Sequence, residues 1–412
     1  MGLFDVFGGK GRRDRFAKRV MERLREQGWP QPISYDPEGF TLWLGEPAGV
    51  VALHRIFHDW SKHPRRAEAA TFDEAIAFIH DLGPPPPFET AAPMLRPAIR
   101  GRAMVEAVLR DPTNADGTSV RTSQPLGEHL TCHVALDRPS SLTLVDGETL
   151  KAWGHTFEDC LEIALSNLRA SNPVRFERHE LGFLFAICED HNEAARLMTP
   201  EVFTGLELEG DPVVVAAARN CVLVAGAKDI KALTLIGAFA PNYLEDHGWP
   251  LSYAPMILRE GQWRGFRPSQ GPIEIADLHV RQRLFDYAEQ RPMLDISLED
   301  RGVSEDVAEL TLFPTENGLV SLVLWSAARM LLPEADFAVI RLDRGHVMVR
   351  AWDDVAAACG LTPFQSSTAA PYFLAAAWPD GEALARLEAA PEPEWARERG
   401  FGIVKGRLTV FG

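Results

Sequence analysis

The clearest alternation of apolar and polar positions lies between Thr156 and Leu168. Apolar residues recur there at the spacing of one helix face, at Phe157, Cys160, Leu161, Ala164, Leu165 and Leu168. Thr156 stands where an N-cap belongs, and Asp159 follows three residues later as a carboxylate variant of the capping box. Upstream, strands are expected at Thr131–Leu136 and Ser141–Val145, with a turn at Asp137. The pattern predicts a capped helix that packs on strands.

Short strands and amphipathic helices continue along the whole chain. Phe16, Val20 and Leu24 mark one face of a helix that Gly28 and Pro30 end. Further strands or hairpins are expected at Pro32–Leu44, Val50–Leu53, Gly182–Ile187, Pro212–Val224, 261–263, Val307–Phe313, Asp336–Arg350, Tyr372–Ala377 and Phe401–Phe411. Further helices are expected at Phe72–Leu82, Ala98–Leu109, Asn192–Leu197, Asp229–Leu244, Ile273–Gln290, Leu322–Leu332 and Gly381–Ala389. These elements predict an α+β fold with small antiparallel sheets and packed helices.

The length of 412 residues exceeds the size at which one hydrophobic core usually keeps growing, so we expect several domains. Pro84 to Pro87 form a proline run that favours extended polyproline geometry, which is typical of a linker. The predicted order is a flexible tail at 1–14, an N-terminal α+β module at 15–83, a proline-rich linker at 84–97, a central α+β domain at 98–266, a charged helical connector at 267–300 and a C-terminal α+β domain at 301–412.

Three pairs of similar segments suggest an internal repeat. FLFAICEDHNEAARL from Phe183 matches FLAAAWPDGEALARL from Phe373. Leu136-Asp137-Arg138 matches Leu342-Asp343-Arg344, and VVVAAARNCVLVAG matches FGIVKGRLTVFG, in the same order along the chain. We therefore predict that the C-terminal domain is a degenerate copy of the central one. The alternative is a chance similarity between two apolar α/β segments.

Composition narrows the classes of function. There are 42 Lys and Arg against 58 Asp and Glu, a formal charge of −16, which disfavours nonspecific binding to nucleic acid, so we expect no DNA or RNA partner. No apolar run reaches the length of a transmembrane helix, and the start lacks the order of a signal peptide. The cysteines are odd in number and lie in apolar runs, at Cys132, Cys160, Cys188, Cys221 and Cys359. These features favour a cytoplasmic location for the protein.

The N-terminal residues combine apolar and basic character. Leu3, Phe4 and Phe7 precede a stretch, Lys10–Arg25, with eight Lys and Arg against two acidic residues. A solvated helix face is the preferred interpretation of that stretch, and a surface for nucleic acid or for an acidic partner is the alternative. Weak contact of residues 1–13 with a membrane surface is a further possibility.

Histidines at helical spacing are the metal candidates. His54 and His58 are four residues apart and could share a zinc ion on one helix face. The glutamate of an HExxH motif is missing, so we favour a solvated face and predict no metal site. His129 and His133 lie on a predicted strand, where four residues span about 13 Å, too far for one ion.

No sequence motif indicates a catalytic site. There is no GxSxG elbow, and Val222–Lys228 is a strand followed by a glycine turn, an arrangement that could receive an anion but is common in α/β units. No cofactor is expected. His133, Asp137 and Arg138 lie at the end of a predicted strand and are the catalytic candidates, although a structural turn is the preferred interpretation.

The central segment carries a family resemblance. LTLVDGETLKAWGHTFEDCLEIALSNL, with Asp137 before it, resembles the signature segment of the YtpQ family, bacterial proteins grouped as a domain of unknown function. FAKRVMERL, ISYDPEGFTLWL and VVALHRIFHDW before it, and RLMTPEVFTGL, CVLVAGAKD and GQWRGF after it, extend the resemblance over about residues 16–266. The long proline stretch and the residues after Phe266 depart from the family. The resemblance implies a cytoplasmic bacterial α+β protein with no catalytic residues to transfer.

The sequence thus favours a non-enzymatic module or scaffold that binds a protein partner. Ten tryptophans, several next to Gly or Pro, supply residues of the type that anchors protein interfaces. The alternative function is a hydrolase or transferase with a site between domains around Asp137 and Arg138. Membrane-surface docking through the N-terminal tail is the other alternative.

Overall fold

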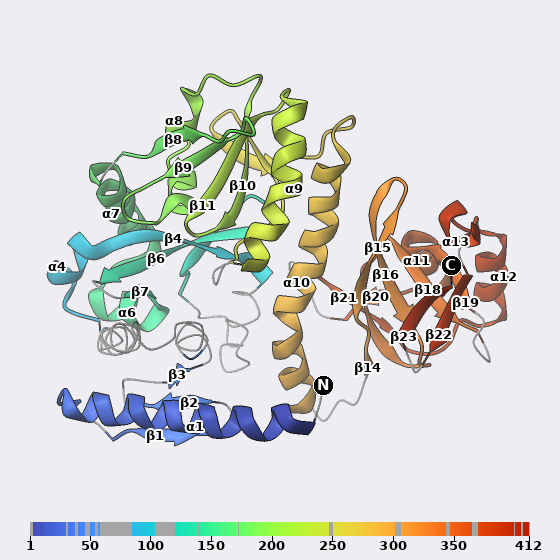
Figure 1. Ribbon diagram of the computed structural model, residues 1–412, viewed down its shortest axis with the longest axis horizontal. Helices are drawn as coiled ribbons and strands as arrows, with labels where there is room; N and C mark the ends of the chain where they lie inside the picture. Colours follow the sequence, from blue (N-terminus) through green and yellow to red (C-terminus); the bar gives the residue numbers. More distant parts are fainter. Residues whose placement is uncertain are drawn as a thin grey trace. The chain divides into compact units, whose positions relative to one another are not determined.

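The computed structural model is an α+β protein with several small antiparallel and mixed sheets, as predicted (Figure 1). It describes residues 3–29, 32–37, 40–45, 50–53, 57, 85–103, 120–138, 141–171, 173–246, 250–300, 306–342, 347–364, 370–398, 400–404 and 407–411. Two compact units are present. Unit 1 comprises Met1–Ala98, Val120–Thr122 and His133–Ser171, and unit 2 comprises Ile99–Ser119, Ser123–Cys132 and Asn172–Gly412. This division differs from the predicted domain boundaries.

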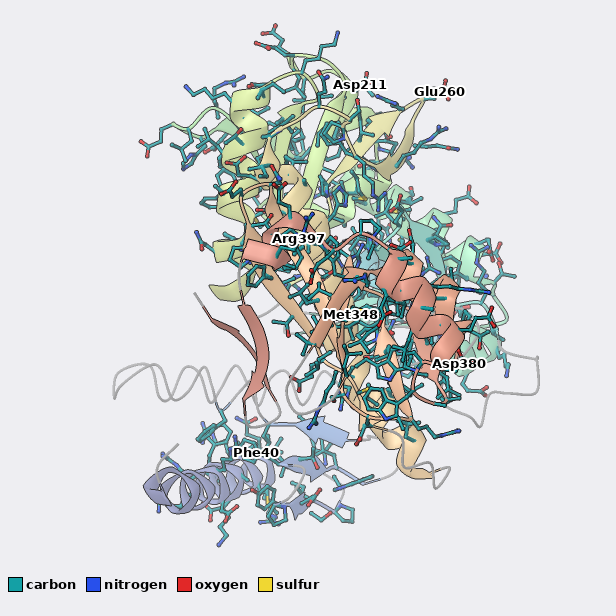
Figure 2. The ribbon with its side chains drawn as sticks, turned by 90° about the vertical axis from the view of Figure 1, so that its right-hand side faces the viewer. Phe40, Asp211, Glu260, Met348, Asp380 and Arg397 are labelled. Carbon is teal, nitrogen blue, oxygen red and sulfur yellow. The ribbon has the colours of Figure 1, made fainter. Side chains whose placement is uncertain are left out.

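The N-terminal part of unit 1 is a helix on a small sheet. Helix α1 (Leu3–Glu26) packs on the antiparallel strands β1 (Ser34–Asp36), β2 (Thr41–Trp43) and β3 (Val50–Ala52). Phe16, Val20 and Leu24 are buried in this core with Phe40, which is labelled in Figure 2. The helix face and the hairpin are confirmed. Helix α1 begins at Leu3, within the stretch 1–14 that was predicted as a flexible tail.

The capped central helix is also confirmed. Helix α7 (Phe157–Ala170) has a full capping box, in which Thr156 Oγ1 accepts from the Asp159 N–H at 3.1 Å and the Asp159 carboxylate accepts from the Thr156 N–H at 2.9 Å. Its apolar face is buried, apart from the half-buried Leu165. Helix α6 (Gly147–Trp153) precedes it and was not predicted. Strands β6 (Leu130–Arg138) and β7 (Ser141–Leu144) pair antiparallel.

The stretch predicted as a linker at 84–97 contains helices and the start of a strand from Phe88 onward, while Pro85 and Pro87 are exposed. It holds helix α4 (Phe88–Ala91), the 3₁₀ helix η1 (Ala92–Met94) and the start of strand β4 (Leu95–Gly101). The Trp153 indole N–H donates to the Pro86 carbonyl at 3.0 Å, and Phe88 stacks on His155 with ring centroids 3.7 Å apart. The Pro86 carbonyl therefore accepts a hydrogen bond from Trp153, and the Phe88 ring that follows the prolines stacks on His155. Residues 98–101, expected to be helical, lie in β4, which belongs with β6, β5 (Ser123–Leu126) and β7 to one four-stranded sheet.

Unit 2 contains a six-stranded sheet of order β13-β12-β10-β11-β9-β8. Its strands are β8 (Arg175–Arg178), β9 (Leu184–Ile187), β10 (Pro212–Ala218), β11 (Cys221–Gly226), β12 (Met256–Arg259) and β13 (Gln262–Gly265). The strand pair turned at Arg219-Asn220 and the hairpin at 261 are confirmed. The segment predicted as a helix from Asn192 is the 3₁₀ helix η3 (Glu193–Met198), followed by the short helix α8 (Glu201–Thr204).

Two long helices accompany this sheet. Helix α9 (Ile230–Asp246) packs apolar residues on β10 and β11, and helix α10 (Ile273–Asp300) lies beside α9 (Figure 1). The close approach requires glycine at 237, since a Cβ there would lie 2.7 Å from the backbone carbonyl carbon of Glu274. Helix α10 continues ten residues beyond the predicted end at Gln290, and α9 confirms the predicted Asp229–Leu244 helix.

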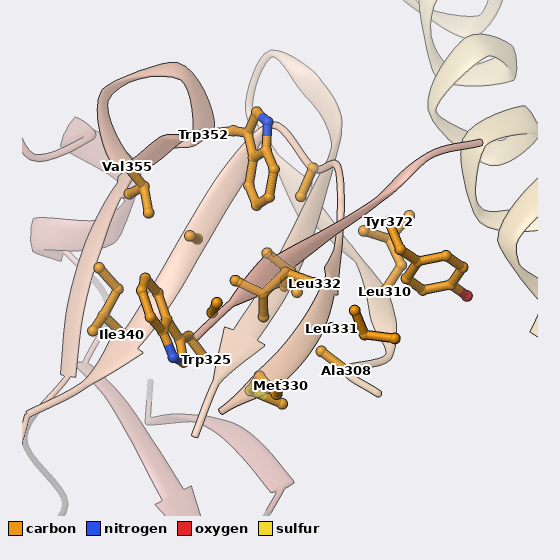
Figure 3. Packing of buried hydrophobic residues seen from close by; sticks show 14 of the residues in the cluster. Ala308, Leu310, Trp325, Met330, Leu331, Leu332, Ile340, Trp352, Val355 and Tyr372 are labelled. Atoms are coloured by element: carbon orange, nitrogen blue, oxygen red, sulfur yellow. The ribbon is translucent and has the colours of Figure 1, made fainter. Parts of the chain in front are cut away.

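The last part of unit 2 is built from two four-stranded sheets around one core, shown in Figure 3. Trp325, Trp352 and Leu332 are among its buried residues. The first sheet joins β15 (Leu310–Thr315), β16 (Gly318–Trp325), β18 (Phe337–Arg341) and β19 (Val347–Ala351), and the second joins β14 (Asp306–Val307), β17 (Met330–Pro333), β21 (Tyr372–Ala375) and β20 (Thr362–Pro363). The remaining elements are α11 (Trp352–Cys359), α12 (Gly381–Ala389), α13 (Glu394–Glu398), β22 (Gly400–Val404) and β23 (Arg407–Phe411).

The helix predicted at Leu322–Leu332 is wrong, because this segment contains the second half of β16 and most of β17. Strand β16 is paired on both sides, antiparallel with β15 and parallel with β18. A strand in that position reads as a short continuous apolar run, which periodicity alone does not separate from a helix. The helix at Gly381–Ala389 and the final hairpin are confirmed.

The predicted internal duplication is not confirmed. Strand β9 pairs with β8 and β11 and is followed by a 3₁₀ helix, whereas β21 pairs with β17 and β20 and is followed by the α-helix α12. Strands β10 and β11 lie in the middle of a six-stranded sheet, whereas β22 and β23 form a two-stranded sheet. The similar sequences therefore occupy different pairing environments.

Candidate functional site

The catalytic candidates from the sequence all lie on β6, but they do not converge. His133 is 2% exposed, and Asp137 is paired within the strand opposite Leu142 instead of forming the predicted turn. Asp137 and Arg138 are consecutive and therefore point to opposite faces of the sheet. His133 and Asp137 share a face but are separated by about 13 Å of strand. The Asp137 carboxylate instead lies 3.8 Å from Arg96 Nε.

The other sequence candidates lead to no site. His54 and His58 lie outside the described residues. At the turn Val222–Lys228, the Asp229 carboxylate accepts from the Ala232 N–H at 2.9 Å and so caps the start of α9 itself. Glu207 and Glu209 line the adjacent hollow of about 330 Å³ together with Asp229 and Arg178. The excess of negative charge makes this turn unsuitable for an anion.

A polar cluster around α10, which the sequence analysis missed, is the candidate site in unit 2. We call it the α10 polar cluster; its members are Glu128, His129, Ser252, Arg267, His279, Gln282 and Asp286. His279, Gln282 and Asp286 recur at i, i+3 and i+7 and therefore share one face of α10. That spacing was visible in the sequence, but the charged helix was interpreted as a connector between domains.

Hydrogen bonds fix the orientation of His129. Its Nδ1 lies 2.8 Å from the Asp286 carboxylate, whose side chain is only 4% exposed. The Gln282 amide N–H₂ donates to the other oxygen of Asp286 at 2.7 Å, and the Gln282 carbonyl accepts from Ser252 Oγ at 2.8 Å and from the Tyr253 N–H at 2.6 Å. Gln282 thus ties the loop at 252–254 to Asp286.

The second nitrogen of His129 faces another carboxylate. His129 Nε2 lies 3.8 Å from Glu128 Oε2, and Glu128 accepts two hydrogen bonds from Arg267 at 2.9 and 2.7 Å. This bidentate contact is the main cause that lowers the pKa of Glu128 and raises that of Arg267. A Cβ at Gly265 would collide with the Glu128 carboxylate, so a larger residue there would displace the Glu128 and Arg267 side chains.

A small cavity of about 10 Å³, room for about one water molecule, adjoins these groups and is lined by Glu128, His129, Ser252 and His279 among others. His279 Nε2 lies 2.8 Å from the Phe266 carbonyl, so this nitrogen carries the proton and Nδ1 is left as an acceptor. Nδ1 is buried and has no partner among the described residues. Burial is the main cause that lowers the pKa of His279 and favours the neutral ring.

This arrangement can hold and transfer a proton, because a buried carboxylate orients the His129 imidazole. It does not prepare a serine nucleophile, since the Ser252 hydroxyl donates to Gln282 instead of to an imidazole. Burial raises the pKa of every cysteine thiol, which disfavours the reactive thiolate; the thiols are Cys132, Cys160, Cys188, Cys221 and Cys359. Over the part of the chain that the structure describes, no three His, Cys, Asp or Glu side chains group as a metal site.

A second surface, in unit 1, is the outer face of α1, which we call the cationic face; its basic residues are Arg15, Lys18, Arg19 and Arg25, all exposed. It lies opposite the buried stripe of Phe16, Val20 and Leu24. Asp14, one of the two acidic residues of the stretch, accepts a hydrogen bond from the Tyr35 hydroxyl at 2.8 Å. This contact fixes α1 on β1. Glu22 and Glu26 are exposed on α1 as well, and Glu26 pairs with Arg23 at 3.2 Å, so the outer face carries both signs with an excess of basic residues.

Comparison of the chain with protein families, curated proteins and solved structures found no match. None of the helices in the described ranges has the length and apolar character needed to cross a bilayer.

Proposed function

We propose that this chain is a non-enzymatic, cytoplasmic module that binds a protein partner, and that the cationic face of α1 contacts an acidic surface of that partner. The observation that carries the proposal is the exposed basic face itself. Residues 10–25 hold eight Lys and Arg against two acidic residues in a chain of charge −16. The resemblance of residues 16–266 to the YtpQ family supports the same class of function, since it supplies no catalytic residues.

The cationic face is suited to recognition because its backbone is fixed before binding. Phe16 is 1% exposed and Val20 and Leu24 are fully buried, so the helix is held to its sheet by packing. Charged groups on a rigid element mainly increase association rates and select partners of opposite charge. The occupant is therefore expected to be acidic, and binding should weaken as salt rises.

The test is affinity capture from native lysate with three proteins. The first is the wild type, the second carries Arg15→Glu, Lys18→Glu and Arg25→Glu, and the third is a matched control. The control carries the same total charge change at exposed positions elsewhere, namely Arg175→Glu, Lys231→Glu and Arg341→Glu.

We expect an acidic protein that binds the wild type and the control, is lost from the α1 variant, and elutes with salt. Equal recovery by all three proteins would overturn the proposal. A second result would also overturn it: the wild type and the control float with phosphatidylserine vesicles, the α1 variant does not, and no protein is captured. That result would favour membrane docking. If light scattering shows that the wild type and the control self-associate and the α1 variant does not, the occupant is a second copy of this chain.

A second candidate function is proton transfer at His129, favoured by its 2.8 Å contact with the buried Asp286. In that case the chain is a hydrolase or transferase. A turnover screen with the wild type and His129→Gln tests it. Activity that disappears in His129→Gln, with an unchanged urea midpoint, would support this function over the binding module. Activity that is the same in both proteins would exclude a role for His129.

A further inference from the structure

Two neighbouring arginines in unit 2, Arg100 and Arg219, differ from the other buried arginines because no carboxylate pairs with them among the described residues. Arg100 lies near the end of β4, and Arg219 lies in the turn between β10 and β11. Among the described residues, the Arg100 side chain donates from Nη1 to the adjacent Ile99 carbonyl, at 2.8 Å. Arg219 Nε is buried and has no partner in the same part of the chain.

The backbone places the two residues in one neighbourhood. The Leu251 N–H donates to the Ala217 carbonyl at 3.0 Å, and Pro250 forms a bridge with Ala218. A Cβ at Gly101 would lie 3.3 Å from the Leu251 carbonyl oxygen. The 250–251 segment therefore contacts the residue after Arg100 and pairs with the residue before Arg219.

Desolvation and like charge both act on this pair. Burial, followed by the charge of Arg219, lowers the pKa of Arg100 to about 10. Buried guanidinium groups elsewhere in unit 2 have carboxylate partners, as in the 2.8 Å contact of Arg196 with Asp190. No such ion pair to Arg100 or Arg219 occurs within the described residues.

Glu193 carries a carboxylate next to the backbone contact of Arg219, since the Ala194 N–H donates to the Arg219 carbonyl at 3.0 Å. Glu193 does not serve as the counter-ion. Its carboxylate accepts from the Cys188 N–H at 2.9 Å, and burial is the main cause that raises its pKa. Contact with a guanidinium would lower that pKa.

We propose that Arg100 and Arg219 bind the oxyanion group of a small ligand, a phosphate or a carboxylate. The planar guanidinium suits both groups through paired N–H donors, and a partly buried pair excludes much of the water that would screen it. An oxyanion between the two groups removes the like-charge repulsion and supplies the acceptor that Arg219 Nε lacks. This site is independent of the cationic face of α1.

The test is calorimetric titration of the full chain in a buffer without phosphate or carboxylate. The probes are inorganic phosphate, succinate and, at equal ionic strength, chloride. The variants are Arg219→Met, Arg100→Met and Arg219→Lys, with Arg175→Met as the matched control at an exposed arginine on β8.

We expect phosphate or succinate to bind more tightly than chloride, and the stronger of the two identifies the ligand class. Loss of hydrogen bonds to a charged group should weaken that binding by at least about tenfold in both Met variants. Arg219→Lys should retain part of the affinity, and Arg175→Met all of it.

Thermal unfolding without ligand gives an independent readout. Arg219→Met should melt no lower than the wild type, because it relieves the repulsion of Arg100. Binding of both oxyanions no tighter than chloride would overturn the proposal. Wild-type affinity in Arg219→Met would overturn it as well. If Arg219→Met does not fold, unchanged oxyanion affinity in Arg219→Lys and Arg100→Met has the same meaning.

Discussion

Gln282 is the residue on which the α10 polar cluster depends most directly. Its side chain contacts Asp286 through the N–H₂ group and contacts Ser252, Tyr253 and Ala254 through the carbonyl. The residue is 1% exposed, so water does not replace these contacts when they are lost. Gln282→Leu keeps the approximate volume and removes all of them.

The magnitude follows from two groups that lose a partner. A buried N–H without this acceptor, as at Tyr253, costs about 1–3 kcal/mol, and a hydrogen bond to the charged Asp286 is worth about 1.5–3 kcal/mol. Ala254 keeps its second acceptor, Ser252 Oγ, at 3.0 Å. We therefore expect Gln282→Leu to lower the free energy of unfolding by about 2.5–6 kcal/mol, a large part of the ~5–15 kcal/mol typical of a domain.

Gln282→Glu separates hydrogen bonding from volume. The introduced carboxylate keeps the acceptors for the loop at 252–254 but places a second negative charge beside Asp286. Burial and this charge raise the pKa of the introduced carboxyl group in the folded state above its value in the unfolded chain. The stability of this variant should therefore be greatest below the unfolded pKa, about 4.3, and should fall as pH rises through the folded pKa.

The assay is urea unfolding followed by tryptophan fluorescence between pH 4 and pH 8. The control is Ala288→Gln at an exposed position of the same helix, which should change stability by less than about 0.5 kcal/mol. A loss below about 1 kcal/mol in Gln282→Leu, or a pH-independent Gln282→Glu, would show that the cluster does not hold α10 in place.

Three further predictions concern the cap, an ion pair and the thiols. Thr156→Ala removes the N-cap of α7 and should cost about 1 kcal/mol in urea unfolding, while Thr156→Ser should cost little; equal losses would contradict the capping role. Arg267 lowers the pKa of Glu128, so this pair stabilises the fold above the unfolded pKa of the carboxyl and loses that effect as pH falls through the folded pKa. The stability difference between the wild type and Arg267→Met should accordingly shrink at low pH, and a constant difference would refute it. Burial raises the pKa of Cys132 and Cys221 to about 12, so neither thiol should react with iodoacetamide at pH 8 until urea unfolds the protein; rapid labelling of the folded chain would contradict their burial.

The elements predicted best were those whose signals are local. The face of α1 at Phe16, Val20 and Leu24 and the cap of α7 at Thr156 each lie within a few turns of one helix, and the structure confirms both. The turn at Arg219-Asn220 joins strands adjacent in sequence, and its prediction is confirmed. Residues three or four positions apart on a helix contact each other in any tertiary context, so the sequence alone determines them.

The elements and the polar cluster that were not predicted depend on contacts between residues far apart in the sequence. The apolar run from Leu322 is strand because β18 and β15 hydrogen-bond to its two edges. Pro86 is held because Trp153, 67 positions beyond it, donates a hydrogen bond to its carbonyl. His129 meets Asp286 across 157 residues. A buried polar group is stable only where another part of the chain supplies its partner, so its chemistry appears only after the fold brings the two together.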